Sequence, residues 1–278
     1  MTSRVLFGVK RLLDTTWGVG PVLGIDTGGR VASVAVTSRG EVKSELVRAP
    51  GTHGAALADM VVEALAMAGC QLAELRAVAV ALGPGSFTGL RVGLAYAKGL
   101  STAANIPLVG VPSLDAIAVS ACQTLSLAPG TRVCPLLDAR RSEFYMALYR
   151  VGSNGLDGLE KLTDDLVVGE NRLAAYLASE NLVVISDFDQ RAMAVGLGTG
   201  NGAVKWLTAD ELPARATYVA ARGGEGLISG TTVGAASLQP IYGRAGDAIF
   251  IAANNAVESV WKPEKKCSFS SSPAMTRN

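Results

Sequence analysis

The chain has 278 residues, of which 25 are Lys or Arg and 24 are Asp or Glu, so its net charge is +1 and only 18% of its residues are charged. A chain with this balance has no overall field that would attract nucleic acid or an anionic membrane, so any RNA contact has to be local or supplied by a partner. No apolar run approaches the roughly 18 residues that a membrane span needs. At this length, two modest domains are expected rather than one.

Both ends of the sequence are expected to be additions to the folded part. Residues 1–21 form an N-terminal extension that lacks the long apolar segment of a signal peptide. Residues 247–278 are expected to be a disordered tail, because they have too little apolar surface to offset the entropy of ordering. The four cysteines contain no CxxC pair, which fits reduced thiols and a cytoplasmic location.

The part between the two ends contains a repeated unit. Residues 22–37 predict an apolar strand that ends at Asp26, a glycine turn and a return strand. The same order recurs later, where residues 132–138 predict a strand ending at Asp138 and residues 144–151 its return strand. The two aspartates occupy equivalent places, where each is expected to end its strand and cap a turn. We therefore expect a first domain over 22–122 and a second, reduced one over 123–246, whose last helix can pack back on the first.

A glycine-rich loop follows the apolar run at residues 76–82 and precedes a helix predicted over 90–104. Its two hydroxyl residues can both cap that helix, and its glycines let a ligand or a partner's backbone approach closely. A phosphate cradle at the helix N-terminus is one interpretation. The other is a rigid turn that starts the helix, with the phenylalanine anchored in the core. The loop comprises Gly83, Pro84, Gly85, Ser86, Phe87 and Thr88.

Two predicted helices are rich in small and apolar residues. The first, over 52–69, is apolar around most of its circumference and is expected to be covered on more than one side. The second, after the glycine loop, has Gly89, Gly93 and Ala97 at intervals of four, a row that permits close approach of another helix. Close packing inside the domain and a subunit interface explain this row equally well.

The duplicated hairpins and alternating strands and helices fit duplicated ribonuclease-H-like domains of the actin, sugar-kinase and heat-shock ATPase (ASKHA) superfamily, an α/β fold. More specifically, the chain resembles the TsaB (YeaZ) family, a noncatalytic partner subunit in the synthesis of threonylcarbamoyladenosine (t6A) on tRNA. Four motifs carry the resemblance, and in the last of them Gly243 stands where a leucine is expected. They are LGIDT at 23–27, GPGSFTGLRVG at 83–93, DAR at 138–140 with Glu143 and Tyr145, and QPIYGR at 239–244.

The resemblance implies a noncatalytic subunit that pairs with a catalytic paralogue, TsaD, and acts with a P-loop ATPase, TsaE. It further implies that tRNA is reached only through the complex, and that ATP and metal belong to the partner subunits. An exposed apolar helical face would also allow the isolated chain to form a homodimer, and the sequence leaves homodimer and monomer open. The implied interface lies on the two helices described above. Its residues are Leu57, Met60, Val61, Leu65, Gly89, Leu90, Arg91, Gly93, Leu94 and Ala97.

Two enzymatic alternatives remain open. A glycoprotease-like peptidase is disfavoured because His53 is the only histidine, and Leu57 stands where a second imidazole ligand would be needed one helical turn later. Ser86 also lacks the GxSxG spacing of a nucleophile elbow. These absences argue against both metal-dependent and serine-dependent hydrolysis.

An ATP-binding kinase of the ASKHA type is the stronger rival. Asp26, Thr27 and Gly28 lie where superfamily members orient magnesium and hold phosphates, with Asp138 as the counterpart in the second half. Two arginines replace the glycine-rich turn that the second half would need, and the glycines at 223–226 are interpreted as a helix end. A vestigial nucleotide site is therefore expected.

Overall fold

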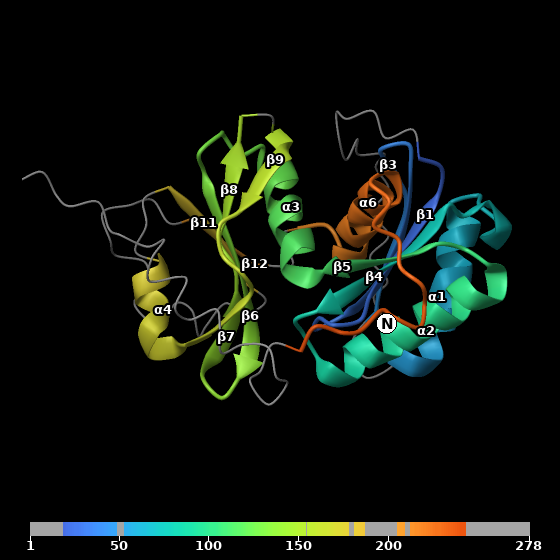
Figure 1. The fold of residues 1–278 in the computed structure, drawn as a ribbon, viewed down its shortest axis with the longest axis horizontal. Helices are drawn as coiled ribbons and strands as arrows, with labels where there is room; N and C mark the ends of the chain where they lie inside the picture. Colours follow the sequence, from blue (N-terminus) through green and yellow to red (C-terminus); the bar gives the residue numbers. More distant parts are fainter. Residues whose placement is uncertain are drawn as a thin grey trace, which may run out of the picture.

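The computed structural model describes residues 19–48, 53–153, 155–177, 181–186, 205–208 and 212–242. They form two lobes, each built on one β-sheet with helices packed on it (Figure 1). Residues 1–18 of the predicted extension and the whole predicted tail lie outside these ranges.

The sheet of the first lobe has the strand order β3-β2-β1-β4-β5 among the described residues. Its first three strands are antiparallel neighbours, whereas β4 and β5 run parallel to β1. All five residues of β1 are buried, as expected for a central strand covered on both faces. The strands are β1 (Val22–Asp26), β2 (Ala32–Ser38), β3 (Glu41–Arg48), β4 (Ala77–Gly83) and β5 (Leu108–Pro112).

The second sheet repeats this pattern in the order β10-β7-β6-β11-β12, where β7 is antiparallel to β6 and β11 is parallel to it. Strand β6 is thus the counterpart of β1, and the predicted duplicated α/β fold is confirmed. The added strand β8 pairs with the start of β6, and β9 pairs with β8. The strands are β6 (Arg132–Arg140), β7 (Glu143–Met146), β8 (Tyr149–Gly152), β9 (Gly155–Lys161), β10 (Leu166–Gly169), β11 (Leu182–Ser186) and β12 (Lys205–Thr208).

The single return strand predicted over 144–151 is wrong, because the chain is divided there into β7 and β8. The break falls at Leu148, whose backbone groups bond to residues after β9 rather than to β6. Its N–H donates to Thr163 Oγ1 at 3.0 Å, and its carbonyl oxygen accepts from Leu162 N at 2.7 Å. The insertion of β8 and β9 therefore interrupts the hairpin.

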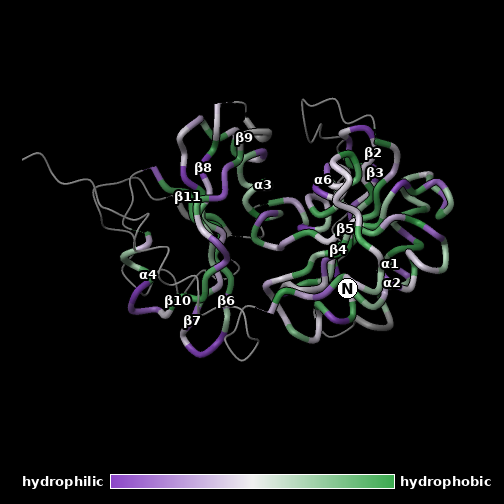
Figure 2. Tube along the Cα trace, in the orientation of Figure 1, coloured by the Kyte–Doolittle hydropathy of each residue, from purple (hydrophilic) through white to green (hydrophobic). Residues whose placement is uncertain are grey.

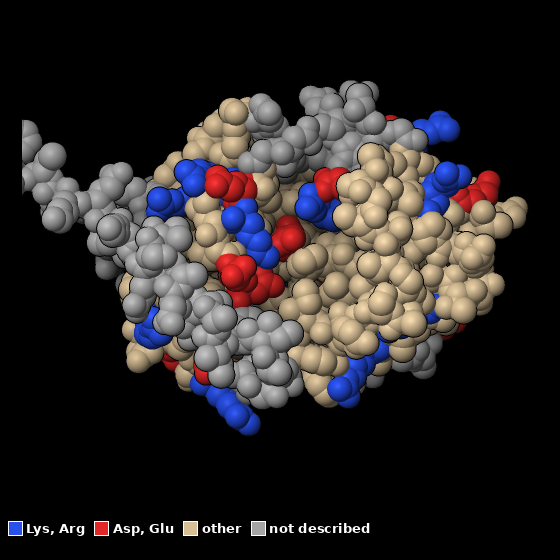
Figure 3. Space-filling model, viewed as in Figure 1, with Lys and Arg blue, Asp and Glu red and all other residues tan. Residues whose placement is uncertain are grey.

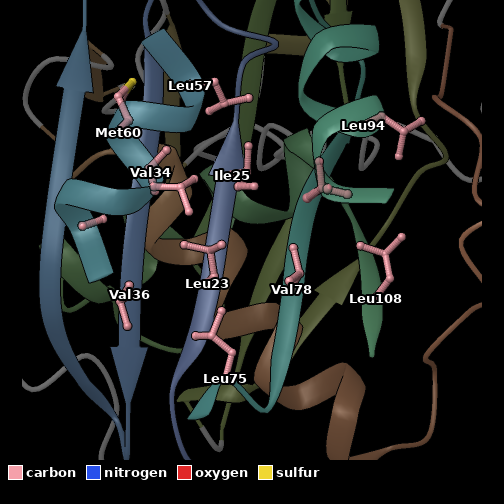
Figure 4. Close-up of a cluster of buried hydrophobic side chains, with 14 of the residues drawn as sticks. Leu23, Ile25, Val34, Val36, Leu57, Met60, Leu75, Val78, Leu94 and Leu108 are labelled. Carbon is pink, nitrogen blue, oxygen red and sulfur yellow. The ribbon is translucent and has the colours of Figure 1, made fainter. Parts of the chain in front are cut away.

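Helices cover both faces of the first sheet. On one face, α1 (His53–Met67) and α2 (Phe87–Ala104) enclose a core in which Leu57, Met60 and Leu94 pack on Leu23, Ile25 and neighbouring strand residues (Figure 4). The other face is covered by α6 (Arg215–Ile228) together with part of α3 (Ser113–Leu125). Helix α3 also packs on the second sheet, so it joins the cores of the two lobes. Helix α4 (Glu170–Leu177) covers the outer face of the second sheet, and a short 3-10 turn, Leu72–Glu74, precedes β4.

Helix α6 follows the second lobe in sequence but packs against the first sheet (Figure 1). Its first three residues are each bonded to a different strand. Arg215 forms an ion pair with Asp26 of β1, and Ala216 N donates to Ser33 Oγ of β2 at 3.2 Å. Thr217 Oγ1 donates to the buried carboxylate of Glu45 on β3 at 2.5 Å. The helix is therefore fixed in register across three strands.

The glycines at 223–226 lie inside α6, so their interpretation as a helix end is wrong. They remove side chains where the helix approaches the sheet. A Cβ on Gly223 would overlap the Cβ of Ala79 on β4, and one on Gly226 would lie 2.7 Å from Val109 Cγ1 on β5. Close approach of helix to sheet compensates for the low helix propensity of glycine.

Hydrophobic residues follow the central strands of the first sheet, whereas the turn between β6 and β7 is strongly hydrophilic (Figure 2). A helix with the length and apolarity of a membrane span does not occur in the described ranges.

The contact between α6 and β1 makes Gly24 a sensitive position. A Cβ there would overlap the carbonyl oxygen of Ala216 and lie 2.7 Å from Ala220 N, both of them backbone atoms that cannot rotate away. We expect Gly24→Ala to lower the free energy of unfolding by about 1–3 kcal/mol, measured by urea unfolding. The matched control is Gly99→Ala on α2, where a Cβ meets nothing within 4 Å and helix propensity predicts a gain of up to about 1 kcal/mol. Equal stability of the two variants would contradict the close α6 contact.

Candidate functional site

Two glycine loops that are far apart in the sequence are bonded to each other. The first glycine loop comprises residues 26–29, starting at the last residue of β1, and the second comprises residues 83–89, from the last residue of β4 into the first turn of α2. Ser86 N donates to the carbonyl oxygen of Gly28 at 2.8 Å, and Thr27 Oγ1 donates to the carbonyl oxygen of Gly89 at 2.7 Å. The backbone N–H of Ser86 and the hydroxyl of Thr27 are therefore engaged within the chain.

The second glycine loop starts α2 earlier than the sequence indicated. Ser86 is the N-cap, and its Oγ accepts from Gly89 N at 3.3 Å, so the helix begins at Phe87 rather than at Leu90. Gly83, the last residue of β4, has φ of 108°, a conformation that favours glycine. Leu90 is buried against the first glycine loop, with its Cδ2 2.6 Å from the place of a Cβ on Gly28.

Phe87 is not anchored in the core as predicted, because 51% of its surface is exposed. Its ring lies 5.0 Å from that of Tyr242, and the guanidinium of Arg91 lies 3.7 Å from its centroid. Arg91 Nε also donates to Tyr242 Oη at 2.8 Å. Just before Tyr242, Ile241 N donates to the carbonyl oxygen of Leu82 at 2.7 Å. The QPIY segment thus binds the second glycine loop from outside.

Asp26 is 1% exposed and is held by two interactions. Its Oδ1 accepts from Gly28 N at 2.7 Å, which is the turn-capping role predicted for it. Its Oδ2 lies 3.2 Å from Nε of Arg215, at the start of α6. A Cβ on Gly29 would overlap the same guanidinium, so Arg215 lies directly against the first glycine loop.

Asp138 makes the same turn in the second lobe, because its Oδ1 accepts from Arg140 N at 2.7 Å. The surroundings differ from those of Asp26. The side chain of Asp138 is 26% exposed, and Arg140, Arg141 and Ser142 all have φ between 55° and 66°. The two equivalent aspartates therefore cap turns in different surroundings: Asp26 is buried, whereas Asp138 is partly exposed.

The predicted interface residues of α1 are already used inside the lobe. Leu57 and Met60 point onto the sheet (Figure 4). They and Val61 are at most 2% exposed, and Leu65 packs partly buried against the same core. The prediction that they supply apolar area to a partner is therefore wrong for the first three. Their place in the helix is fixed by the need to cover β1 and β2.

The predicted small-residue row of α2 also faces inward. A Cβ on Gly89 would overlap the carbonyl oxygen of Thr27, one on Gly93 would overlap Thr27 Oγ1, and Ala97 is fully buried. This row packs against the first glycine loop and the sheet, so close packing inside the domain is its explanation. Leu94 is buried with them, and only Arg91 of the predicted α2 residues is exposed.

A different set of small residues faces outward from the same two helices. We call it the outer helix face; its members on each helix follow one another at intervals of four. Val62, its largest apolar residue, is 67% exposed. The outer helix face comprises Ala58, Val62 and Ala66 of α1 and Ala95, Gly99 and Ala103 of α2. The sequence contains both rows, and it does not show which of them points to solvent.

A charged cluster lies away from the glycine loops, where side chains of both signs gather between the lobes (Figure 3). Lys161 Nζ is 2.9 Å from Oδ1 of Asp115 and 2.7 Å from Oδ1 of Asp165, and Tyr149 Oη donates to Asp115 at 2.6 Å. Burial raises the pKa of Tyr149, and Asp115 raises it further. Burial lowers the pKa of Lys161, but Asp165 and Asp115 outweigh this and raise it. The pKa of Asp165 is raised by burial against the opposing effect of Lys161.

This cluster was not predicted, since its members come from α3, β8, β9 and the following loop and share no sequence motif. One ammonium group, that of Lys161, pairs with both carboxylates, and the phenol of Tyr149 donates to Asp115. The arrangement ties the start of α3 to the inserted strands. Among the described residues, the structure brings together no group of three or more His, Cys, Asp and Glu that could hold a metal ion.

Comparisons with known proteins agree on one family. The family model described as "TsaD: tRNA N6-adenosine threonylcarbamoyltransferase" matches residues 48–194. The chain is 36% identical over 135 residues to the "tRNA threonylcarbamoyladenosine biosynthesis protein TsaB" of Escherichia coli, covering 49% of this chain and 57% of that protein. It is 32% identical over 146 residues to the Bacillus subtilis protein of the same name, covering 52% and 60%. The matches thus span somewhat more than half the length of these curated relatives.

Among solved structures, the fold is similar to that of a Pseudomonas aeruginosa protein described as uncharacterised "with similarity to peptidase YEAZ". The TM-score is 0.66 at 25% identity, over 81% of this chain and 100% of that one. The matched family model, the TsaB relatives and this fold together show that the chain is a TsaB/YeaZ member of the family that the TsaD model describes.

Proposed function

We propose that the chain is a noncatalytic subunit in t6A synthesis on tRNA, where it pairs with a TsaD-like catalytic subunit and acts with a TsaE-like ATPase. The names of the relatives support the role in t6A biosynthesis. In this proposal the complex works in the cytoplasm, tRNA is contacted only through the assembled complex, and ATP and metal are bound by the partner subunits.

The outer helix face is the observation that carries the pairing proposal. Helices α1 and α2 contact each other and cover the same face of the sheet, so their outward sides form one continuous surface. The small residues on both helices let a second pair of helices approach closely. Exposed Val62 and Met67 add apolar area, as in the centre of protein interfaces.

The arrangement of the polar residues supports a role without catalysis. Thr27 of the first glycine loop donates to the second loop, and Ser86 of the second loop caps α2. Asp26 is paired with Arg215, and Asp115 and Asp165 with Lys161. Ser86 has no described base beside it, which weakens the peptidase alternative further.

The kinase alternative keeps one observation in its favour, namely the equivalent turns made by Asp26 and Asp138. A kinase needs both loops open to a nucleotide. The engagement of the first loop with Ser86, Gly89 and Arg215 disfavours this alternative.

Pairing is tested with charge placed on the outer helix face. We expect Val62→Asp to weaken binding to the TsaD-like subunit at least about 30-fold, because an unpaired carboxylate would be buried at the centre of the interface. The matched control is Ile228→Asp at the end of α6, outside the outer helix face. Ile228 is 65% exposed and Val62 is 67% exposed, so the two positions are equally accessible. Isothermal titration calorimetry measures both affinities. Equal affinities would rule out this face as the interface.

Gly99 gives a second test that does not disturb the fold. A Cβ at Gly99 meets nothing within 4 Å, so Gly99→Leu is expected to leave the unfolding temperature unchanged and to weaken pairing sterically. Gly93→Leu, by contrast, is expected to destabilise the isolated chain, since a Cβ there overlaps Thr27 Oγ1. Size-exclusion chromatography of the same variants tests whether the isolated chain forms a homodimer through this face. If Gly93→Leu alone abolished pairing without loss of stability, the inward assignment of its row would be contradicted.

The role in tRNA modification is tested by reconstitution. We expect t6A, measured by mass spectrometry of digested tRNA, to form only when this chain, the TsaD-like subunit and the TsaE-like subunit are combined with unmodified tRNA, ATP and a threonylcarbamoyl donor. The isolated chain is expected to give no ATP hydrolysis. Hydrolysis by the isolated chain would favour the kinase alternative, and unchanged t6A yield when the chain is omitted would refute the proposed role.

A further inference from the structure

Asp26 is a buried carboxylate whose charge has to be balanced inside the protein. It is 1% exposed, and Oδ2 accepts no hydrogen bond from the described residues, although Arg215 Nε lies 3.2 Å away. An isolated ionised carboxylate in such a place is strongly unfavourable, so a cation must accompany it. The side chain of Arg215 is itself only 15% exposed, so the pair is shielded from solvent.

The first glycine loop does not fit a metal-bound nucleotide. Such a ligand needs an available carboxylate, uncommitted loop groups and space above the glycines. Here Asp26 Oδ1 accepts from Gly28 N, the carbonyl oxygen of Gly28 accepts from Ser86 N, and Thr27 donates to Gly89. The guanidinium lies so close to Gly29 that even a Cβ there would overlap it.

We infer that Arg215 is a resident counter-ion that takes the place of a metal-bound phosphate at the first glycine loop and excludes such a ligand from it. The guanidinium is permanently charged, and it is delivered by α6, whose next two residues are bonded to β2 and β3. The ion pair of Arg215 with Asp26 therefore both helps to fix the start of α6 and fills the space at the first glycine loop. The inference concerns the isolated chain and holds whether or not the proposed pairing is correct.

The counter-ion role predicts coupling between Asp26 and Arg215. In thermal unfolding of the full chain, Arg215→Ala should lower the unfolding temperature by several degrees, because it leaves a buried carboxylate unpaired. Adding Asp26→Asn should recover part of this loss. The matched control is Arg222→Ala on the same helix, where the pair with Glu225 is 38% and 31% exposed and its removal should have little effect. If the decrease in unfolding temperature of the double variant equalled the sum of the decreases of Asp26→Asn and Arg215→Ala, the inference would be overturned.

A guanidinium-sized space should remain when Arg215 is shortened. Low millimolar guanidinium chloride, compared with sodium chloride at equal ionic strength, should raise the unfolding temperature of Arg215→Ala but not that of the wild type, Arg222→Ala or the double variant. The absence of any difference between the two salts for Arg215→Ala would contradict the counter-ion role. If that variant fails to fold, Arg215→Lys and Arg215→Gln replace it, and Lys should retain more stability than Gln.

Exclusion of the ligand is measured separately by titrating Mg²⁺-ATP into the wild type and Asp26→Asn. No binding heat is expected with either protein. Heat from the wild type that disappears in Asp26→Asn would show that the loop accepts a metal–nucleotide, and would overturn the exclusion while leaving the pairing test on the outer helix face unaffected.

Discussion

Helix α6 closes the face of the first sheet that α1 and α2 leave uncovered, and it comes from a part of the chain that follows the second lobe (Figure 1). Its first turn is bonded to β1, β2 and β3 through Arg215, Ala216 and Thr217. Close approach at Gly24 then lets the helix bury Val219 and Ala220 against the central strands. Because a sheet with one bare apolar face is not stable in water, the first lobe depends on this late segment.

This constraint also determines which surfaces remain for partners. Because α6 and α3 cover one face of the first sheet, α1 and α2 cover the other. The larger apolar residues of α1 and α2 are therefore buried in the core (Figure 4). The glycines that open α2 are used against Thr27, where they let the two glycine loops bond to each other. What is left outside is a second row of small residues on each helix. The surface that the proposed function requires is thus a consequence of how the core is filled.

The two lobes show how one hairpin can lead to two different loops. The aspartates at the end of β1 and within β6 cap equivalent turns, but only Asp26 meets a largely shielded arginine from another part of the chain. Asp138 stays partly exposed beside a turn of three left-handed residues. Capping is a local property of aspartate and a turn, whereas the balance of its charge depends on what packs above it.

Much of the architecture is determined by the sequence alone, because strand and helix periodicity, glycine turns and capping residues act over a few neighbouring positions. The duplicated hairpins, the helix after GPGSFTG, the capping role of Ser86 and the family motifs could all be recognised in this way. Tertiary structure decided the rest. The rows 89/93/97 and 95/99/103 have the same spacing, so only the position of the sheet shows which one is buried. The contact of Arg215 with Asp26 and the cluster around Lys161 join segments with no shared motif, and such pairings exist only after the chain has folded.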